Sequence, residues 1–424
     1  MGLRSTRIKA CAPSFPSSGR RASAAMARLA AALSEADAAR RTELVEAAQE
    51  ELGGDEPSDH TIHHLLQLLA DADADVRRAA LAFAAEAGPL APKALSRLLP
   101  PIVAMLHDES AVVVKRCLMT SAALLRPALR LLAADKLPLS DEHSALAESV
   151  NQLRLDAIGM LSNAAHKDTV RTQAVKLCEA VVLACTPEPS SGESDASESG
   201  VVAEGVPASA PSEKPVIMSH AIFGGATAAQ WAHETLRCLT GLLADPPSPT
   251  LLCVTANSLA LSIARSRPAM LPSIVEALTS CQSHLVPAPG ESAARIVIPA
   301  AGLANVQQAL KSAMISLVKQ LHTLSPDALV SEGSSDGAAA TSKKEAERSL
   351  FSSLVAAGAS NQLQMVLRQM GREMPSAEEL RPAIVPGAGS ADGVAGPSGV
   401  KRLHNDDNAG PDAKRHEGGA VLQQ

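Results

Sequence analysis

The stretch VRTQAVKLCEAVVLAC, residues 170–185, decides the fold of this chain. Its apolar residues recur at the spacing of a single helical stripe: Val170, Ala174, Leu177, Cys178, Val181, Val182 and Cys185. Polar and charged residues, including Arg171, Gln173 and Lys176, fall off that stripe. The pattern predicts an amphipathic helix that buries one face against neighbouring helices.

The same stripe recurs on both sides of this stretch. It is formed upstream by Val76, Ala80, Phe83, Ala84 and Ala87, and downstream by Leu252, Ala256, Leu259, Ala260, Ile263 and Ala264. Two copies also begin alike, because DADADVRRAAL (71–81) and DESAVVVKRCL (108–118) both run from Asp through Val to basic residues and an apolar pair. Such a start is typical of the second helix of a HEAT-type repeat, and repeats of about 40 residues indicate a solenoid. We predict an all-α fold, an α-solenoid of HEAT/armadillo-like helical hairpins with disordered termini and one long disordered insertion.

The composition agrees with helix-on-helix packing and excludes several other classes. Hydrophobic residues make up 46% of the 424 residues but aromatic residues only 1%, which argues against β-sandwiches, barrels and base-stacking surfaces. A net charge of −7 and a pI near 6.0 give no basic field for nucleic acid, so we expect no direct RNA contact. The seven cysteines form no C-x-x-C pair, and no apolar run approaches the roughly 18–20 residues that cross a bilayer. We expect a soluble intracellular protein with no membrane partner.

Changes in composition predict the organisation of the chain. Residues 1–25 are basic and acid-free, which indicates a disordered tail or, alternatively, an organelle transit peptide, and Met26 could be the true start instead of Met1. The solenoid is predicted over 26–374 and a disordered tail over 375–424. Within the solenoid, residues 186–215 are rich in Pro, Ser, Gly and Glu and predict a flexible insertion, and residues 286–299 predict a Pro/Gly loop.

Helical periodicity predicts the hairpins of the solenoid. The expected pairs are 27–33 with 36–52, 61–70 with 75–87, 92–106 with 110–133, 141–165 with 168–185, 227–244 with 250–266, and 268–284 with 300–324. One or two further helices are expected in 343–370, broken near Gly358. Pro127 should kink or split the helix over 110–133.

Catalytic and metal-binding signatures are missing from the sequence. No phosphate-binding, nucleophile-elbow or zinc-protease motif occurs, which together with the solenoid pattern favours a non-enzyme without a cofactor. His60, His63 and His64 have a helical spacing that could hold a metal, but no Cys or acidic second motif completes a site. We interpret the three histidines as a solvated helix face and expect no metal.

Basic residues recur near the starts of the second helices, and stacked repeats would bring them to one surface. They are Arg77, Arg78, Lys115, Arg116, Arg171 and Lys176. One interpretation is a ladder of Asp–Arg pairs between neighbouring repeats. The other is a partly basic ridge that docks an acidic partner surface, because screened surface pairs contribute little to stability. The sequence pattern leaves both interpretations open.

Two basic doublets in the C-terminal tail predict a nuclear-import signal. Lys401-Arg402 and Lys414-Arg415 bracket the polar spacer LHNDDNAGPDA, and this spacing resembles a bipartite signal. Import through these residues would place the protein in the nucleus, with an organelle as the alternative if residues 1–25 are a transit peptide.

Three stretches carry a resemblance to a known family. They are MLHDESAVVVKRCLMTSAALLRPAL (105–129), DTVRTQAVKLCEAVV (168–182) and TANSLALSIARSRPAMLPSIVEAL (255–278). In their order and spacing, from about Ala30 to Met374, they resemble the N-terminal domain of the symplekin family. The most specific feature is the I-A-R-x-R-P turn between two helices, which general HEAT repeats do not require.

The resemblance implies a nuclear scaffold of pre-mRNA cleavage and polyadenylation. It implies that the solenoid binds and stimulates a phosphatase of the RNA polymerase II C-terminal domain, alongside cleavage and polyadenylation factor subunits. A phosphatase-facing lysine of the family corresponds to Lys176, and a contact asparagine corresponds to Ala309. We predict partner contacts at Lys176, Arg171, Lys115 and Arg116.

The resemblance leaves two matters open. The large C-terminal part of symplekins is not in the sequence, which we interpret as a truncation, a partial gene product or a short protein. A generic HEAT/armadillo adaptor in transport or proteostasis is the alternative function. A helical enzyme with an unrecognised site is a third hypothesis, but the sequence shows no cluster of titratable groups for it.

Overall fold

A computed structural model describes residues 18–134, 140–186, 228–285, 296, 298–325, 336–376 and 378–380. Met1–Arg381 forms one compact unit, and the second unit, Pro382–Gln424, lies outside the described residues. The described residues form helices and turns without a strand, which confirms the all-α prediction. The predicted insertion beyond Thr186, most of the loop over 286–299 and the tail beyond residue 380 lie outside the described residues.

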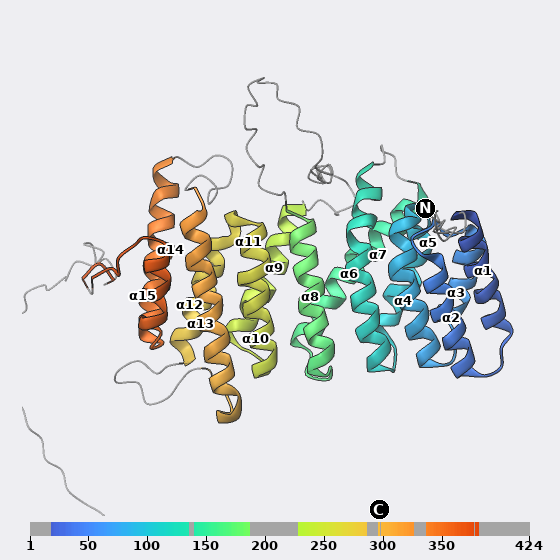
Figure 1. The fold of residues 1–424 in the computed structure, drawn as a ribbon, viewed down its shortest axis with the longest axis horizontal. Helices are drawn as coiled ribbons and strands as arrows, with labels where there is room; N and C mark the ends of the chain where they lie inside the picture. The colour runs from blue at the N-terminus through green and yellow to red at the C-terminus, as the bar shows by residue number, and fades with distance from the viewer. Residues whose placement is uncertain are drawn as a thin grey trace, which may run out of the picture. The chain divides into compact units, whose positions relative to one another are not determined.

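The helices form antiparallel hairpins that stack in chain order (Figure 1). The first helices of the hairpins are α1 (Ser18–Ser34), α3 (Asp59–Leu69), α5 (Leu95–Ala104), α7 (Asp141–Ser162), α9 (Ala228–Ala244), α12 (Leu271–Leu285) and α14 (Asp336–Ala356). The second helices are α2 (Ala38–Leu52), α4 (Ala74–Leu90), α6 (Ala111–Ala134), α8 (Asp168–Ala184), α10 (Pro249–Asn257), α13 (Ala300–Thr323) and α15 (Ser360–Gln369).

Each helix contacts its hairpin partner and the equivalent helices of the adjacent hairpins. Thus α4 packs between α2 and α6, and α6 packs between α4 and α8, whereas α5 contacts α3 and α7. The first helices therefore form one layer and the second helices form another, as expected of a helical solenoid.

Short segments complete the turns between the helices. They are the 3₁₀ turns η1 (Pro92–Ala94), η2 (Met105–His107) and η5 (Pro268–Met270), the π-helical turn η4 (Ser258–Ile263) and the short helix α11 (Ala264–Ser266). The segment from α10 through η4 to α11 runs as one second-layer helix, which contacts α8 on one side and α13 on the other.

Side-chain caps start several of these helices. The Asp73 carboxylate accepts hydrogen bonds from the backbone N–H groups of Asp75 and Val76 at the start of α4, and Ser58 caps α3 through the N–H of Thr61. Gly53, with φ 53°, follows the end of α2 in the left-handed conformation that glycine adopts without strain. The acidic turns identified in the sequence are therefore helix starts.

The predicted stripe of α8 forms part of the core. Every member, from Val170 to Cys185, is buried. The equivalent stripes of α4 and of the segment from Leu252 to Ala264 are buried too. Local periodicity therefore identified the buried faces correctly.

The structure corrects two expectations. Helix α1 begins at Ser18 and buries Ala25 and Leu29, so the predicted tail over 1–25 extends too far into the chain. The Arg and Ser residues of this segment resembled tail composition, but its Ala-rich sequence is also a good helix former. Helix α6 continues through Pro127, where Leu124, Leu125 and Ala128 are buried, so the predicted split is wrong, whereas the predicted kink stays a prediction.

Among the described residues, no helix is both long enough and apolar enough to span a lipid bilayer.

Candidate protein-interaction surface

Arginines of the second layer form the predicted ladder with acids of the next repeat. Arg41 Nε of α2 lies 3.1 Å from Asp71 Oδ2, in the turn before α4. Arg77 of α4 makes a bidentate pair with Asp108, with Nε–Oδ2 at 2.8 Å and Nη2–Oδ1 at 2.9 Å. All four side chains are largely buried, so these charges are used between repeats and are not presented to a partner.

The same arginines also donate hydrogen bonds to backbone carbonyls in the turn that joins the two helices of their own hairpin. Arg77 Nη1 donates to the Asp71 and Ala72 carbonyls at 2.9 and 2.8 Å, and Arg41 Nη1 donates to the Glu35 and Ala36 carbonyls. These carbonyls lie in the turn between the two helices, where no intrahelical donor reaches them. The ladder interpretation therefore describes Arg77 correctly.

Arg171 departs from the expected surface position. It is only 4% exposed, and its Nε and Nη2 donate to the Leu161 carbonyl at 3.1 and 2.7 Å. Although it lies off the apolar stripe, its long side chain folds back to the C-terminal end of α7 and satisfies a carbonyl there. We therefore leave Arg171 out of the candidate contact surface.

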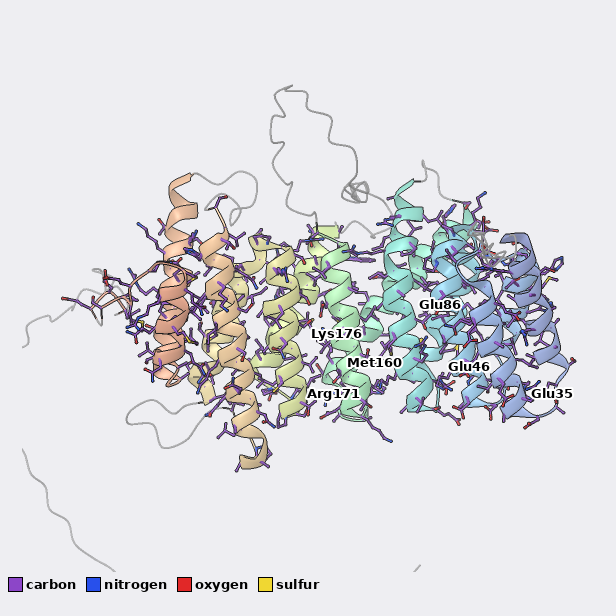
Figure 2. The ribbon with its side chains drawn as sticks, viewed as in Figure 1. Glu35, Glu46, Glu86, Met160, Arg171 and Lys176 are labelled. Carbon is purple, nitrogen blue, oxygen red and sulfur yellow. The ribbon has the colours of Figure 1, made fainter. Side chains whose placement is uncertain are left out.

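Lys176 lies on the exposed face of α8, next to the fully buried Leu177. Figure 2 shows Lys176 and Arg171 on this helix. The Lys176 ammonium is 2.8 Å from Glu179 Oε2, and the side chains of Lys176 and Glu179 are 47% and 13% exposed. Glu179 also accepts a hydrogen bond from the Ser258 hydroxyl of η4. The lysine is thus oriented by an acid that is itself held by the next repeat.

Lys115 and Arg116 lie on α6, the second-layer helix that precedes α8 and packs against it. Lys115 is exposed, whereas Arg116 is partly buried and its Nε has no hydrogen-bond partner. Burial and the nearby positive charge of Arg78 lower the pKa of Arg116, and Glu86 opposes this shift. Of these two adjacent cations, only Lys115 is fully presented at the surface of α6.

Sequence reasoning missed the π-helical turn η4, which follows α10 directly. Leu261 in η4 is 49% exposed, and Arg265, four residues later, is exposed as well. The Ala260 carbonyl accepts a hydrogen bond from Gln320 Nε2 of α13 at 2.8 Å. The turn sits inside the stretch that carries the I-A-R-x-R-P motif, and the apolar periodicity of that stretch is the same as in a regular helix.

Other candidate sites have clear outcomes. His63 and His64 lie with ring centroids 6.0 Å apart, and no group of residues in the described ranges could hold a metal ion. The six described cysteines are free.

The remaining predicted positions are Ala309 and the import residues. Ala309 lies partly buried on α13. The predicted import residues Lys401, Arg402, Lys414 and Arg415 lie outside the described residues.

Comparison with known proteins identifies the family. The family described as Symplekin/PTA1 N-terminal matches residues 110–357, which is more than half of the 424 residues. The match includes Lys115, Lys176 and the I-A-R-x-R-P turn. Among solved structures, the chain is similar to the crystal structure of an engineered protein, with a TM-score of 0.30 and 14% identity over 69% of this chain and 97% of that chain. The family match shows that this chain belongs to the symplekin/PTA1 N-terminal family.

Proposed function

We propose that this protein is a non-catalytic scaffold that binds and stimulates a phosphatase of the RNA polymerase II C-terminal domain. Family membership supports a scaffold role in mRNA 3′-end processing. The observation that carries the finer proposal is the position of Lys176, exposed on the second layer and oriented by Glu179. Lys176 corresponds in sequence to the phosphatase-facing lysine of the family, which supports proposing it as the contact residue.

The surface next to Lys176 suits an acidic partner. The segment from α10 to α11 and helix α13 contain no Asp or Glu, whereas Arg265 and Lys319 are exposed on them. In the described part of the chain, neither cation forms an ion pair. Leu261 adds an exposed apolar side chain one turn before Arg265. Free cations around an exposed leucine are complementary to an acidic surface with an apolar centre.

The proposed mechanism requires no chemistry from this chain. The solenoid would hold the phosphatase in its active conformation and raise its effective concentration near other cleavage and polyadenylation factor subunits. Such a role places the protein in the nucleus, and import would use the two basic doublets of the C-terminal tail.

A binding measurement with purified proteins tests this function. We expect Lys176→Glu in the full chain to weaken binding of the phosphatase by about tenfold or more, because the reversal places like charge against an acidic surface. Lys344→Glu on the first layer is the matched control, since Lys344 is exposed on α14 and the charge change is equal. Stimulation of the phosphatase on a phosphorylated polymerase-tail peptide should fall in parallel. Absence of binding by the unmodified chain, or equal binding by Lys176→Glu, would leave the generic adaptor as the better interpretation.

A further inference from the structure

The exposed face of α6 is a narrow stripe of apolar and basic side chains. Its members follow one another at steps of three or four residues: Val112, Lys115, Met119, Ala123, Arg126 and Arg130. Val112 is 57% exposed and Met119 is 42% exposed. The helix has 24 residues and none of them is Asp or Glu. Helix α6 therefore presents positive charge and apolar surface along this stripe without an acid of its own.

Two cations of this stripe, Lys115 and Arg126, differ from the cations of the neighbouring helices. On α4, Arg78 lies 3.3 Å from Asp75 and 3.7 Å from Glu46, and on α8 Lys176 pairs with Glu179. Among the described residues, Lys115 and Arg126 form no such pair. These two cations of α6 thus differ from the paired cations Arg78 of α4 and Lys176 of α8.

The apolar members lie between and beside these cations. Seven large hydrophobic side chains are exposed in the described part of the chain, and two of them, Val112 and Met119, lie seven residues apart on this stripe. Single exposed hydrophobics need no explanation, but two of them in line with two unpaired cations form a patterned surface. Exposed methionine is also common on surfaces that bind helices, because its side chain adapts to the partner.

We propose that this α6 stripe docks an acidic amphipathic helix of a partner protein. Lys115 and Arg126 are 11 residues apart, which is about 16 Å along a helix. The side chains on one face of a partner helix alongside α6 recur at the same three- and four-residue steps as those of the stripe. Two acidic residues of the partner can therefore pair with Lys115 and Arg126, while its apolar residues cover Val112 and Met119. An extended peptide turns alternate side chains to opposite faces and does not repeat this spacing.

The composition of the stripe favours such a helix over RNA. Helix α6 contains no aromatic residue, so it offers no ring for base stacking. The proposal assigns Lys115, one of the partner contacts predicted from the sequence, to this stripe and not to the surface around Lys176. The scaffold would then carry a docking position in addition to the one proposed for the phosphatase.

Fluorescence anisotropy with the full chain tests the proposal. The probe is a labelled 18-residue peptide with Leu along one helical face and Glu on both flanks. We expect Lys115→Glu/Arg126→Glu to weaken its binding at least tenfold and Val112→Ser/Met119→Ser to weaken it several-fold. The control Arg237→Glu/Lys344→Glu makes the same charge change on exposed first-layer positions and should bind as the unmodified chain does. Lys176→Glu should also leave this binding unchanged, which separates the result from the phosphatase proposal.

Other outcomes would overturn the proposal. Equal binding by the α6 charge reversal and its control would show that the stripe is not the site. Equal binding of a scrambled peptide with the same composition would show that charge alone attracts the probe. Failure of the peptide to bind, together with α6-dependent binding of a 20-nucleotide oligo(U), would assign the stripe to RNA.

Discussion

Arg267 Nε donates to Thr186 at two atoms, the carbonyl oxygen at 3.0 Å and the hydroxyl at 2.7 Å, across 81 positions of sequence. Its Nη2 also donates to the Leu183 carbonyl at 2.5 Å. These acceptors lie at the C-terminal end of α8, where carbonyls lack intrahelical donors. The second arginine of the I-A-R-x-R-P turn therefore caps a helix of the preceding hairpin and joins the hairpins on either side of residues 187–227.

Arg267→Ala should lower the free energy of unfolding by about 2–4 kcal/mol, because it removes a buried guanidinium and leaves several carbonyls unsatisfied. Arg267→Lys should recover little of this, since an ammonium cannot reproduce the planar fork. Urea unfolding followed by the fluorescence of Trp231, the single tryptophan, measures the change. Arg265→Ala, an exposed neighbour, should stay within about 0.5 kcal/mol. Equal stability of Arg267→Ala and Arg265→Ala would contradict this capping role.

The fold was predictable where the signal is local. The stripe from Val170 to Cys185 repeats within one helix, so periodicity alone identified its buried face. The turn containing Arg267 stood out as a motif, but nothing in its sequence points to an acceptor at Thr186. Neither a non-local hydrogen bond of this kind nor the π-helical turn η4 changes the spacing of apolar residues in the sequence, so periodicity cannot predict them.

The candidate site shows the same limit in two residues of α8. Arg171 and Lys176 both lie off the stripe, and the sequence pattern treated them alike. The structure separates them, because the Arg171 side chain reaches the Leu161 carbonyl while Lys176 stays exposed beside Glu179. Whether a basic side chain forms contacts inside the solenoid depends on whether an acceptor on a neighbouring helix lies close enough to it. The packing of the helices decides this, and the local sequence does not show it.

The register of α8 predicts opposite results for adjacent substitutions. Leu177→Asp should unfold the neighbouring repeats or cost more than about 4 kcal/mol, because it places a charge in a fully buried position. Lys176→Ala should leave helicity and melting unchanged. Circular dichroism with thermal melting of both variants measures this. A melting curve of Leu177→Asp that matches the unmodified protein would contradict the packing of α8.

The bidentate pair of Arg77 and Asp108 should couple two repeats energetically. A double-mutant cycle of Arg77→Ala and Asp108→Ala should give an interaction energy of about 1–2 kcal/mol, since both side chains are mostly buried. The exposed pair of Arg40 and Glu43 on α2 provides the control, with an expected coupling of about 0.5 kcal/mol or less. Urea unfolding of the seven proteins, with the unmodified chain common to both cycles, gives both energies. Similar coupling in the two cycles would show that the ladder does not hold the repeats together.

Alkaline pH should destabilise the solenoid through its buried thiols. Burial raises the pKa of Cys117, Cys185 and Cys281 to about 12 in the folded protein, whereas an unfolded thiol titrates near 8.5. Above that pH the unfolded chain loses protons that the folded chain retains, so stability is complete below about pH 8 and falls as pH rises toward 12.

The expected loss between pH 8 and pH 10 is about 2 kcal/mol per buried thiol, measured as the shift of the urea midpoint. The chain has no tyrosine, so phenol ionisation adds nothing to this slope. Replacing Cys117, Cys185 and Cys281 together by Ala lowers the starting stability but should make the pH dependence shallower, with buried Cys178, whose pKa burial also raises, retaining part of it. The half-buried Cys253 provides the matched single control, because burial raises its pKa as well but it remains partly accessible. An unchanged slope in the triple variant would assign the alkaline loss to groups other than these thiols.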